Sequence, residues 1–181
     1  MKYFIDCEFI ENGKTIDLIS IAITADDGRE LYLQNTECKF NRASIWVKKH
    51  VFPSLRSFDT KRLKPCLGPH DAPSGHTIWA SRRQIAADIF RFVGENMPEW
   101  WGYYSAYDHV VLCQLFGPMI ELPDGWPMWT NDLQQWASQL GISSLESRIP
   151  PNNEHDALSD ARWNQKAWHY LQARAALKDI S

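Results

Sequence analysis

Apolar residues form three short runs near the start of the chain, and these runs predict three β-strands. Residues 3–10 and 16–24 are the first two, and the second of them, IDLISIAIT, is almost continuously apolar. The tripeptide ENG at 11–13 separates them and is typical of a tight turn. A third strand over 30–33 follows a second turn signal, DDG at 26–28. The start of the chain is therefore predicted to form an antiparallel meander.

The rest of the chain shows mostly helical spacing of its apolar residues. The predicted helices cover residues 41–50, 81–97, 106–116, 131–140 and 156–176, with one short strand at 99–103. Ser81 and Gln84 form a capping-box pattern at the second helix, and Asp156 is the expected N-cap of the last. Three strands followed by helices, a further strand and more helices predict an α/β fold with a mixed sheet.

Residues 54–76 interrupt this order without clear periodicity. The stretch contains three prolines, two glycines and a basic run formed by Lys61, Arg62 and Lys64. We predict a long irregular insertion here, because loops of this length are uncommon unless they have a function or are disordered. The basic run has two interpretations, contact with an RNA backbone or a solvated loop. No shift of composition divides the chain, so residues 1–181 are predicted to form a single domain.

Composition narrows the classes of function. The 181 residues are 44% hydrophobic and 23% charged, as in globular proteins, and no apolar run approaches the ~20 residues of a membrane span. No secretory leader is recognisable, so a cytoplasmic location without a membrane partner is expected. The formal net charge of -3 argues against binding nucleic acid through a general basic field. Bound divalent cations can still bring phosphates to an acidic pocket, which makes carboxylate clusters the feature of interest.

Asp6 and Glu8 are two positions apart on the first predicted strand, so their side chains project from the same face. A solvated face is the ordinary interpretation of such a pair. The neighbouring positions indicate burial instead, because Phe4 and Ile10 share that face and the opposite face is also apolar. Buried carboxylates must be paired or bind a metal. Ligation by oxygen atoms alone favours Mg²⁺ or Mn²⁺.

Two further acids and one histidine lie at predicted helix starts. Asp108 follows the aromatic strand in the first turn of its helix, where a capping role beside Ser105 and a functional role are both open. His155 and Asp160 are five positions apart, about 500° of rotation on a helix, so they cannot share a helical face. His155 must therefore precede the helix if both residues reach one site. Otherwise it is a surface residue near a cap.

Together these residues resemble the three motifs of the DEDD exonuclease superfamily in its His-containing (DEDDh) branch. The segments FIDCEFI, YYSAYDHVVLCQLFGPM and HDALSDAR are most similar to the polyadenylate-specific exoribonuclease RNase AS family. The resemblance implies an RNase H-like exonuclease fold with a central mixed five-stranded sheet flanked by helices. It also implies 3′-to-5′ hydrolysis of RNA to nucleoside 5′-monophosphates, a preference for adenylate tracts such as poly(A), and a homodimer.

In this family pattern, the metal-binding acids correspond to Asp6, Glu8, Asp108 and Asp160, and the general base to His155. Two divalent cations, Mg²⁺ or Mn²⁺, about 3.5 to 4 Å apart, activate water and stabilise the leaving oxygen in such enzymes. An imidazole whose ordinary pKa is about 6.5 can accept the proton of that water at neutral pH.

Phe9 and Tyr107 are the candidates for contact with the terminal nucleotide. Strand alternation by itself places Phe9 on the face opposite the acids. Tyr104 stands where many DEDDh enzymes have Asn, so nucleotide contacts from that turn cannot be transferred to this chain. Two alternatives remain open. One is a DNA-directed or generic DEDDh exonuclease, since no residue reveals a contact to a 2′-hydroxyl. The other is a catalytically silent RNase H-like nucleic-acid-binding module.

Overall fold

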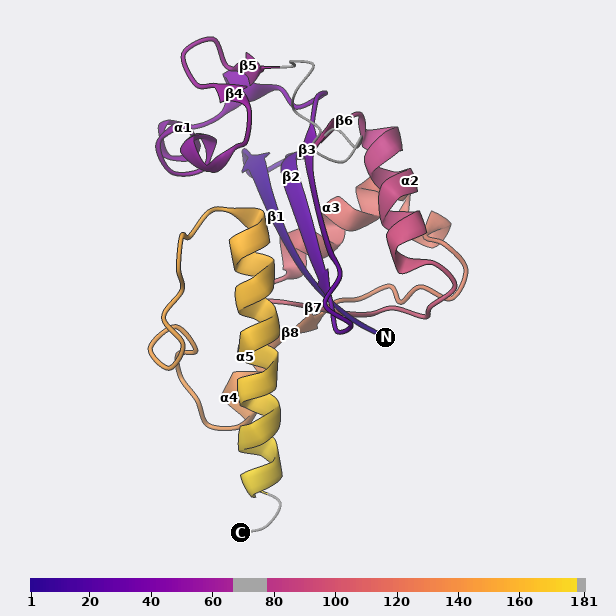
Figure 1. Cartoon of the computed structure of the whole chain (residues 1–181), viewed down its shortest axis with the longest axis vertical. Helices are drawn as coiled ribbons and strands as arrows, with labels where there is room; N and C mark the ends of the chain where they lie inside the picture. Colours follow the sequence, from indigo (N-terminus) through magenta and orange to yellow (C-terminus); the bar gives the residue numbers. More distant parts are fainter. Residues whose placement is uncertain (67–77, 179–181) are drawn as a thin grey trace.

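The computed structural model describes residues 1–66 and 78–178, and a six-stranded sheet forms its centre (Figure 1). Across the sheet, the strands lie in the order β6 (Trp79–Ala80), β3 (Glu30–Asn35), β2 (Ile16–Ala25), β1 (Lys2–Glu11), β7 (Glu99–Gly102) and β8 (Asn131–Asp132). The first three strands of the chain pair antiparallel, whereas β6, β7 and β8 each pair parallel to a neighbour. The predicted meander and the mixed sheet are thus confirmed.

The sheet has six strands where five were expected. The strands that the apolar pattern did not predict, β6 and β8, contain two residues each. Two residues are too few for an alternating pattern, and both strands exist only because they pair with β3 and β7. The pairing of β8 also delays the helix predicted over 131–140, which begins at Leu133.

The described residues form five α-helices: α1 (Ile45–His50), α2 (Arg82–Val93), α3 (Ala106–Phe116), α4 (Leu133–Gln139) and α5 (Ala157–Lys178). Side chains that alternate along β1 separate two cores. Tyr3 and Ile5 pack with α2 and α3 on one face, and Phe4 packs with α4 and α5 on the other. Figure 1 shows α2 and α3 on one side of the sheet and α4 and α5 on the opposite side. None of the helices in the described part of the chain combines the length and the apolar composition needed to cross a lipid bilayer.

Two helix boundaries differ from the prediction for local reasons. The helix expected over 41–50 begins at Ile45, because a 3₁₀ turn, η1 (Phe40–Arg42), and the N-cap Ser44 precede it. The capping box of Ser81 and Gln84 is present as predicted at the start of α2. That helix ends at Val93, earlier than expected, because Gly94 has a φ of 64° that interrupts helical geometry.

Residues 39–66 form a small lobe beyond the end of β1 and next to the start of α5 (Figure 1). The lobe contains η1, α1, a second 3₁₀ turn η2 (Phe52–Ser54), and the two short strands β4 (Phe58–Asp59) and β5 (Lys64–Pro65), which pair antiparallel. Phe40, Phe52 and Phe58 contact one another and form its aromatic core. The predicted irregular insertion is therefore folded over residues 54–66, while its remainder, 67–76, lies outside the described residues.

Candidate metal-binding and catalytic site

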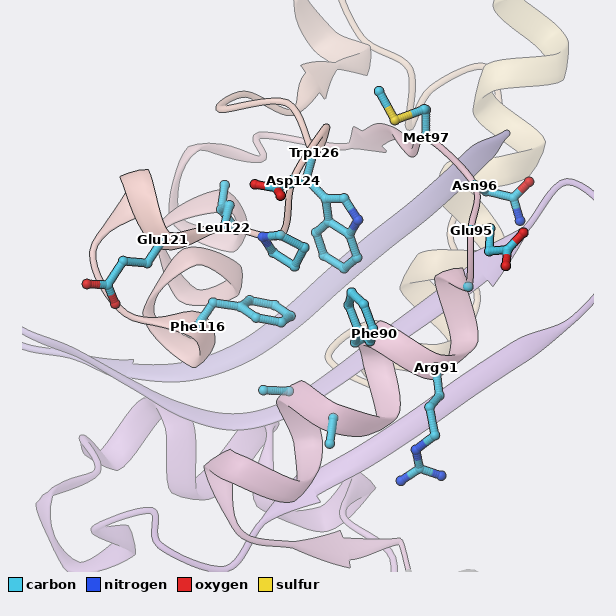
Figure 2. A pocket seen from close by; sticks show the side chains of 14 residues that line it. Phe90, Arg91, Glu95, Asn96, Met97, Phe116, Glu121, Leu122, Asp124 and Trp126 are labelled. Atoms are coloured by element: carbon cyan, nitrogen blue, oxygen red, sulfur yellow. The ribbon is translucent and has the colours of Figure 1, made fainter.

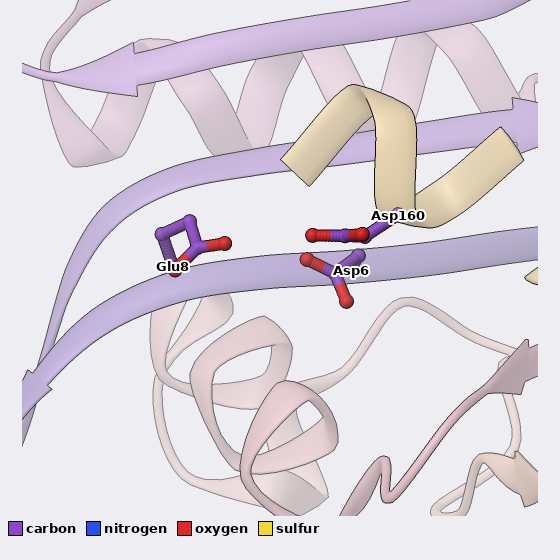
Figure 3. A group of neighbouring side chains, drawn as sticks. All are labelled: Asp6, Glu8 and Asp160. Atoms are coloured by element: carbon purple, nitrogen blue, oxygen red, sulfur yellow. The ribbon is translucent and has the colours of Figure 1, made fainter. Parts of the chain in front are cut away.

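Three carboxylates from two distant parts of the chain meet on the α5 face of the sheet (Figure 3). Asp6 and Glu8 project from β1, and Asp160 comes from the first turn of α5. One carboxylate oxygen of each residue lies within 4.8 Å of the other two. Asp6 and Glu8 share a face of β1, as their spacing predicted. All three side chains can therefore contribute to the binding of one cation.

Small side chains let α5 lie close to the sheet at this point. Ala157 and Ala161 are buried against Ala22 of β2. Asp160 lies between these two alanines in the sequence, so its carboxylate faces β1 across a short gap. A larger residue in place of Ala161 would push the helix outward and separate Asp160 from Asp6.

Asp108 approaches the carboxylates from α3. Its Oδ1 accepts a hydrogen bond of 2.7 Å from the backbone N–H of Cys7, and the residue is only 7% exposed. β7 pairs with β1 only as far as Phe4. Further along β1, the Asp108 carboxylate accepts the hydrogen bond of the Cys7 N–H in place of a β7 carbonyl. Asp108 is outside the group of three whose oxygens lie within 4.8 Å, but it is close enough for its charge to act on Asp6.

Asp108 lies in the first turn of α3, as predicted, but the capping box considered for Ser105 and Asp108 is absent. Ser105 occupies the N-cap position of α3 but its side chain makes no cap hydrogen bond. Asp132 anchors this corner instead. Its Oδ2 accepts from the Ser105 N–H at 2.8 Å, and its Oδ1 accepts from the Gln135 N–H at 3.0 Å at the start of α4. Our sequence analysis missed Asp132, although an Asp three positions before a Gln is a capping signal that could have drawn attention to it.

Gly102 is a second supporting residue that the sequence analysis missed. A Cβ added at Gly102 would lie 2.8 Å from the Ser105 Cβ and 3.2 Å from the Ile5 carbonyl oxygen. Real Cβ atoms do not approach other atoms so closely, so only glycine lets the end of β7 lie against β1 at this point. The corner that carries Asp108 is held by Asp132 and depends on Gly102.

His155 lies immediately before α5, which is the position that its five-residue separation from Asp160 required. Its φ is 68°, and in this left-handed conformation its backbone N–H donates to the Asp160 Oδ2 at 2.9 Å. The Asp156 side chain accepts from the Ser159 N–H and caps the helix, as predicted. The backbone of His155 is thus tied directly to one of the three clustered carboxylates.

The His155 ring packs against the lobe of residues 39–66. Its centroid lies 4.7 Å from that of Trp46 and 6.0 Å from that of His50, both on α1. The His155 carbonyl also accepts a hydrogen bond from the Ser54 hydroxyl. The lobe therefore contacts both the ring and the backbone of His155.

Burial raises the pKa of each of the four carboxyl groups and is the largest cause in every case. The pKa of Glu8 rises to about 8, and the pKa values of Asp108 and Asp160 rise to about 7. The pKa of Asp6 is raised well above its ordinary value, because the other three carboxylates also repel a charge there. Ionising all four groups at neutral pH is therefore costly in the protein alone.

The donor set fits a divalent cation. Ion pairs in the described residues involve Asp27, Glu30, Asp59 and Asp88, and none of them neutralises a carboxylate of the site. A cluster of buried and partly buried acids without a basic partner is stabilised by a bound cation, which lowers the cost of ionisation. Oxygen-only donors suit Mg²⁺ or Mn²⁺. Carboxylates that hold divalent cations in this way are suited to metal-dependent hydrolysis of a phosphate ester.

Phe9 and Tyr107 lie on the other side of the sheet from the three clustered carboxylates. Their rings make an edge contact, with centroids 5.7 Å apart, and Phe9 packs against the core beneath α2 and α3. A β-bulge separates Glu8 from Phe9 in the pairing with β2. Tyr107 is 48% exposed. Contact of these two residues with a nucleotide stays a prediction.

A separate hollow of about 1090 Å³ lies between α2 and the loop that leads to β8 (Figure 2). Phe90, Phe116 and Trp126 form its apolar part, with charged side chains such as Glu95 and Asp124 around them. None of the four site carboxylates lines this hollow. Among the described residues, the cluster of Asp6, Glu8 and Asp160 is the one group of three or more potential metal ligands.

Comparison with known proteins identifies relatives of this chain. Residues 68–172 match the sequence profile of the 3′-5′ exoribonuclease Rv2179c-like domain. Two proteins of Mycobacterium tuberculosis, the 3′-5′ exoribonucleases Rv2179c (strain H37Rv) and MT2234.1 (strain CDC 1551), are each 42% identical to it over 165 residues. The match covers 90% of this chain and 88% of each relative. The chain belongs to the Rv2179c-like 3′-5′ exoribonuclease family.

The fold agrees with that of a more distant exonuclease. A solved structure of a 3′-exonuclease in the 3′-end specific recognition of a histone mRNA stem-loop aligns with a TM-score of 0.50 at 9% identity. The alignment covers 98% of this chain and 81% of that one, and at this identity it shows likeness of fold alone. The profile of the Rv2179c-like family spans Asp108, His155 and Asp160, whereas Asp6 and Glu8 precede it. In the structure, both parts of the chain contribute to one site.

Proposed function

We propose that this member of the Rv2179c-like family is a metal-dependent 3′-to-5′ exoribonuclease that releases nucleoside 5′-monophosphates. The observation that carries the proposal is the meeting of Asp6, Glu8 and Asp160 within 4.8 Å, beside the buried Asp108. The relatives support the direction of hydrolysis and the class of substrate. The carboxylates supply a place for the cations that such hydrolysis needs.

Asp6, Glu8, Asp108 and Asp160 are the residues that would hold two divalent cations, Mg²⁺ or Mn²⁺. When bound, the cations activate water, orient the scissile phosphate and stabilise charge on the leaving oxygen. The protein contributes a rigid frame for these ligands: β1 carries two of them, α5 is packed closely through its alanines, and a buried corner holds the fourth.

His155 is the proposed general base. It would accept the proton of the attacking water at an imidazole nitrogen, because its backbone is tied to Asp160 and its ring is held beside Trp46. The left-handed backbone at this position turns the chain into α5, so His155 and Asp160 can serve one site without sharing a helical face.

Finer features belong to the same proposal. We assign the fold to the RNase H-like architecture of the DEDDh branch, with support from the antiparallel meander that continues into parallel strands. A preference for adenylate tracts and a homodimer rest on the similarity of the motifs around Asp6, Asp108 and Asp160 to the RNase AS family.

The direct test is digestion of 5′-labelled oligo(A), mixed-sequence RNA and matching DNA by the natural protein and Asp6→Ala. We expect a ladder that shortens from the 3′ end with Mg²⁺ or Mn²⁺, disappears with chelator, and is absent with the variant. Faster cleavage of oligo(A) than of mixed RNA would support the adenylate preference. Preferential cleavage of DNA would move the assignment to a DNA-directed exonuclease. A folded natural protein that cleaves none of the strands with either metal would indicate a silent binding module.

A further inference from the structure

Positive charge is concentrated in the lobe of residues 39–66. This segment has eight Lys or Arg residues and a single acid, giving it a formal charge of +7 in a chain whose net charge is -3. The basic residues are Lys39, Arg42, Lys48, Lys49, Arg56, Lys61, Arg62 and Lys64, and all except the partly buried Lys48 are exposed. The rest of the protein is therefore strongly acidic, and the lobe is the region suited to a polyanion.

Within the part of the chain that the structure describes, most of this charge forms no ion pair. Among the ion pairs of the described residues, one involves the lobe, between Arg62 and Asp59 at 3.7 Å, and the Arg62 side chain is 74% exposed. Exposed cations held on a folded surface without counter-charges bind phosphates and release the counterions of a nucleic acid.

The same lobe carries a half-exposed tryptophan, Trp46, next to His155. Trp46 on α1 is 52% exposed. His50 stacks on its ring, with centroids 4.9 Å apart and planes 25° from parallel, and His155 makes an edge contact with it at 4.7 Å. A tryptophan fixed by two neighbours and still open over half its surface is well suited to stack with a nucleobase.

We propose that the lobe of residues 39–66 binds the single-stranded 3′ end of the substrate, with one base near the scissile phosphate stacked on Trp46. Phosphates further along the strand lie on the lobe's Lys and Arg side chains. This inference rests on the proposed exonuclease function and adds the surface that receives the strand. Trp46 is connected to the clustered carboxylates through a single residue. Its ring contacts His155, and the His155 backbone N–H donates to Asp160.

The charge of the lobe favours RNA over a second copy of the chain as the occupant of this surface. In a symmetric dimer the same surface meets itself, so an interface here would bring two segments of formal charge +7 together. A polyphosphate strand instead neutralises that charge. The strand would then pass from this basic surface to the acidic site, where bound cations remove the repulsion between carboxylates and phosphates.

The first test measures, in the presence of Ca²⁺, the binding of an RNA that ends in a 3′ oligo(A) tract. The natural protein, Trp46→Ala and Trp46→Phe are compared. We expect Trp46→Ala to weaken binding by about 5- to 100-fold, as loss of one stacked base does, and Trp46→Phe to retain most of the affinity. Phe90→Ala is the matched control, because Phe90 is equally exposed at 51% but lies on α2 beside the separate hollow. Unchanged binding by a folded Trp46→Ala protein would overturn the proposal.

Abasic nucleotides locate the stacked base. Oligo(A) with an abasic residue at each of its last three positions is compared for the natural protein and Trp46→Ala. At the position whose base stacks on Trp46, the abasic nucleotide and Trp46→Ala together should weaken binding no more than either change alone. Both changes remove the same contact. If the fold-losses of affinity multiply at all three positions, Trp46 stacks on none of the last three bases.

The second test concerns the lobe's charge. The slope of the logarithm of the RNA-binding constant against the logarithm of salt concentration should become shallower by up to about 2 in the triple variant Lys61→Gln/Arg62→Gln/Lys64→Gln. Each lost phosphate contact on a single strand contributes about 0.7 to this slope. The matched control is Arg83→Gln/Lys166→Gln/Arg174→Gln, three exposed basic residues outside the lobe, and should leave the slope unchanged. Equal slopes for the two variants would contradict the inference.

Hydrolysis of bis(p-nitrophenyl) phosphate, which has no base and a single phosphate, separates binding from catalysis. Trp46→Ala should lose several-fold more kcat/KM on RNA than on this substrate, because only RNA offers a base for Trp46 to stack on. An equal loss on both substrates would mean that Trp46 positions His155, and the stacking proposal would be wrong. If the natural protein cleaves no RNA but the binding effects persist, the exonuclease assignment fails and the lobe assignment stands. Normal cleavage by all variants overturns the lobe assignment alone.

Discussion

The side-chain amide of Asn164 donates a hydrogen bond of 2.9 Å to the backbone carbonyl of Ile5, and both residues are buried. Ile5 directly precedes Asp6 on β1, and Asn164 follows Asp160 by about one turn of α5. The bond therefore fixes the spacing of the two elements that carry the clustered carboxylates. It does so at a point where the acids repel one another, so it opposes the separation that their charges favour.

Asn164→Leu should destabilise the protein and impair its activity. Leucine has a similar size but cannot donate to the Ile5 carbonyl, and a buried acceptor left without a partner costs about 1–3 kcal/mol. The free energy of unfolding from denaturant titration and the rate of RNA cleavage check this. Gln165→Ala is the control, because Gln165 makes only a long contact of 3.4 Å to the Ala25 carbonyl. Equal stability of the two variants would argue against the role given to Asn164.

The metal-free protein should lose stability as the pH rises from 5 to 8. The folded pKa values of Glu8, Asp108 and Asp160 are about 7 to 8, above those of the unfolded chain, so in this window the native state binds more protons. Stability then falls with rising pH. Thermal unfolding in EDTA and in Mg²⁺ or Mn²⁺ measures it. The cation should raise Tm more at pH 8 than at pH 5, and an equal increment at both would contradict the prediction.

Asp160→Asn should separate stability from activity. The amide oxygen can still accept from the His155 N–H, while the removed charge relieves repulsion within the cluster. We expect a higher Tm than the natural protein at pH 8 without metal, a smaller gain from Mg²⁺, and no measurable RNA cleavage. Asp124→Asn, an acid beside the separate hollow, is the control and should change none of these. A variant that is less stable without metal would count against the electrostatic argument.

Gly102→Ala should displace the corner that carries Asp108. The added Cβ would meet the Ser105 Cβ at 2.8 Å, and such overpacking typically costs about 1–3 kcal/mol. RNA cleavage should fall with it, because Asp108 would shift relative to Cys7. Gly13→Ala offers a comparison: its φ of 78° strains an alanine, but its added Cβ meets no atom within 4 Å. Full activity of Gly102→Ala alongside a normal Tm would refute this role.

His155→Asn should reduce the cleavage rate without loss of metal binding. Asparagine tolerates the left-handed φ of 68° and keeps the backbone N–H that donates to Asp160, so the fold of the α5 start should persist. Loss of a general base lowers rates by about 10²- to 10⁴-fold. Single-turnover cleavage and calorimetric titration with Mn²⁺ measure the two properties. A rate within a few fold of the natural protein would exclude His155 as the base.

Local patterns in the sequence were sufficient for the long elements and for part of the site. Apolar residues on both faces of β1 predicted its burial, and the two-residue spacing of Asp6 and Glu8 predicted their shared face. The five-residue separation of His155 and Asp160 required His155 to precede α5, and Asp156 caps that helix as its position indicated. These inferences succeeded because periodicity and capping depend on residues within a few positions of one another.

The assembly of the site was decided by tertiary structure. No local pattern distinguishes Asp108 as a ligand candidate from Asp108 as a helix-start acid, and its bond to the Cys7 N–H spans 101 positions. The two-residue strands β6 and β8 and the packing of Trp46 on His155 likewise arise from segments far apart in the chain. By itself, the sequence determined the longer elements and the candidate side chains that they carry. The distances between them depend on strand register and on close packing, which involve all the elements at once and were decided only by the folded structure.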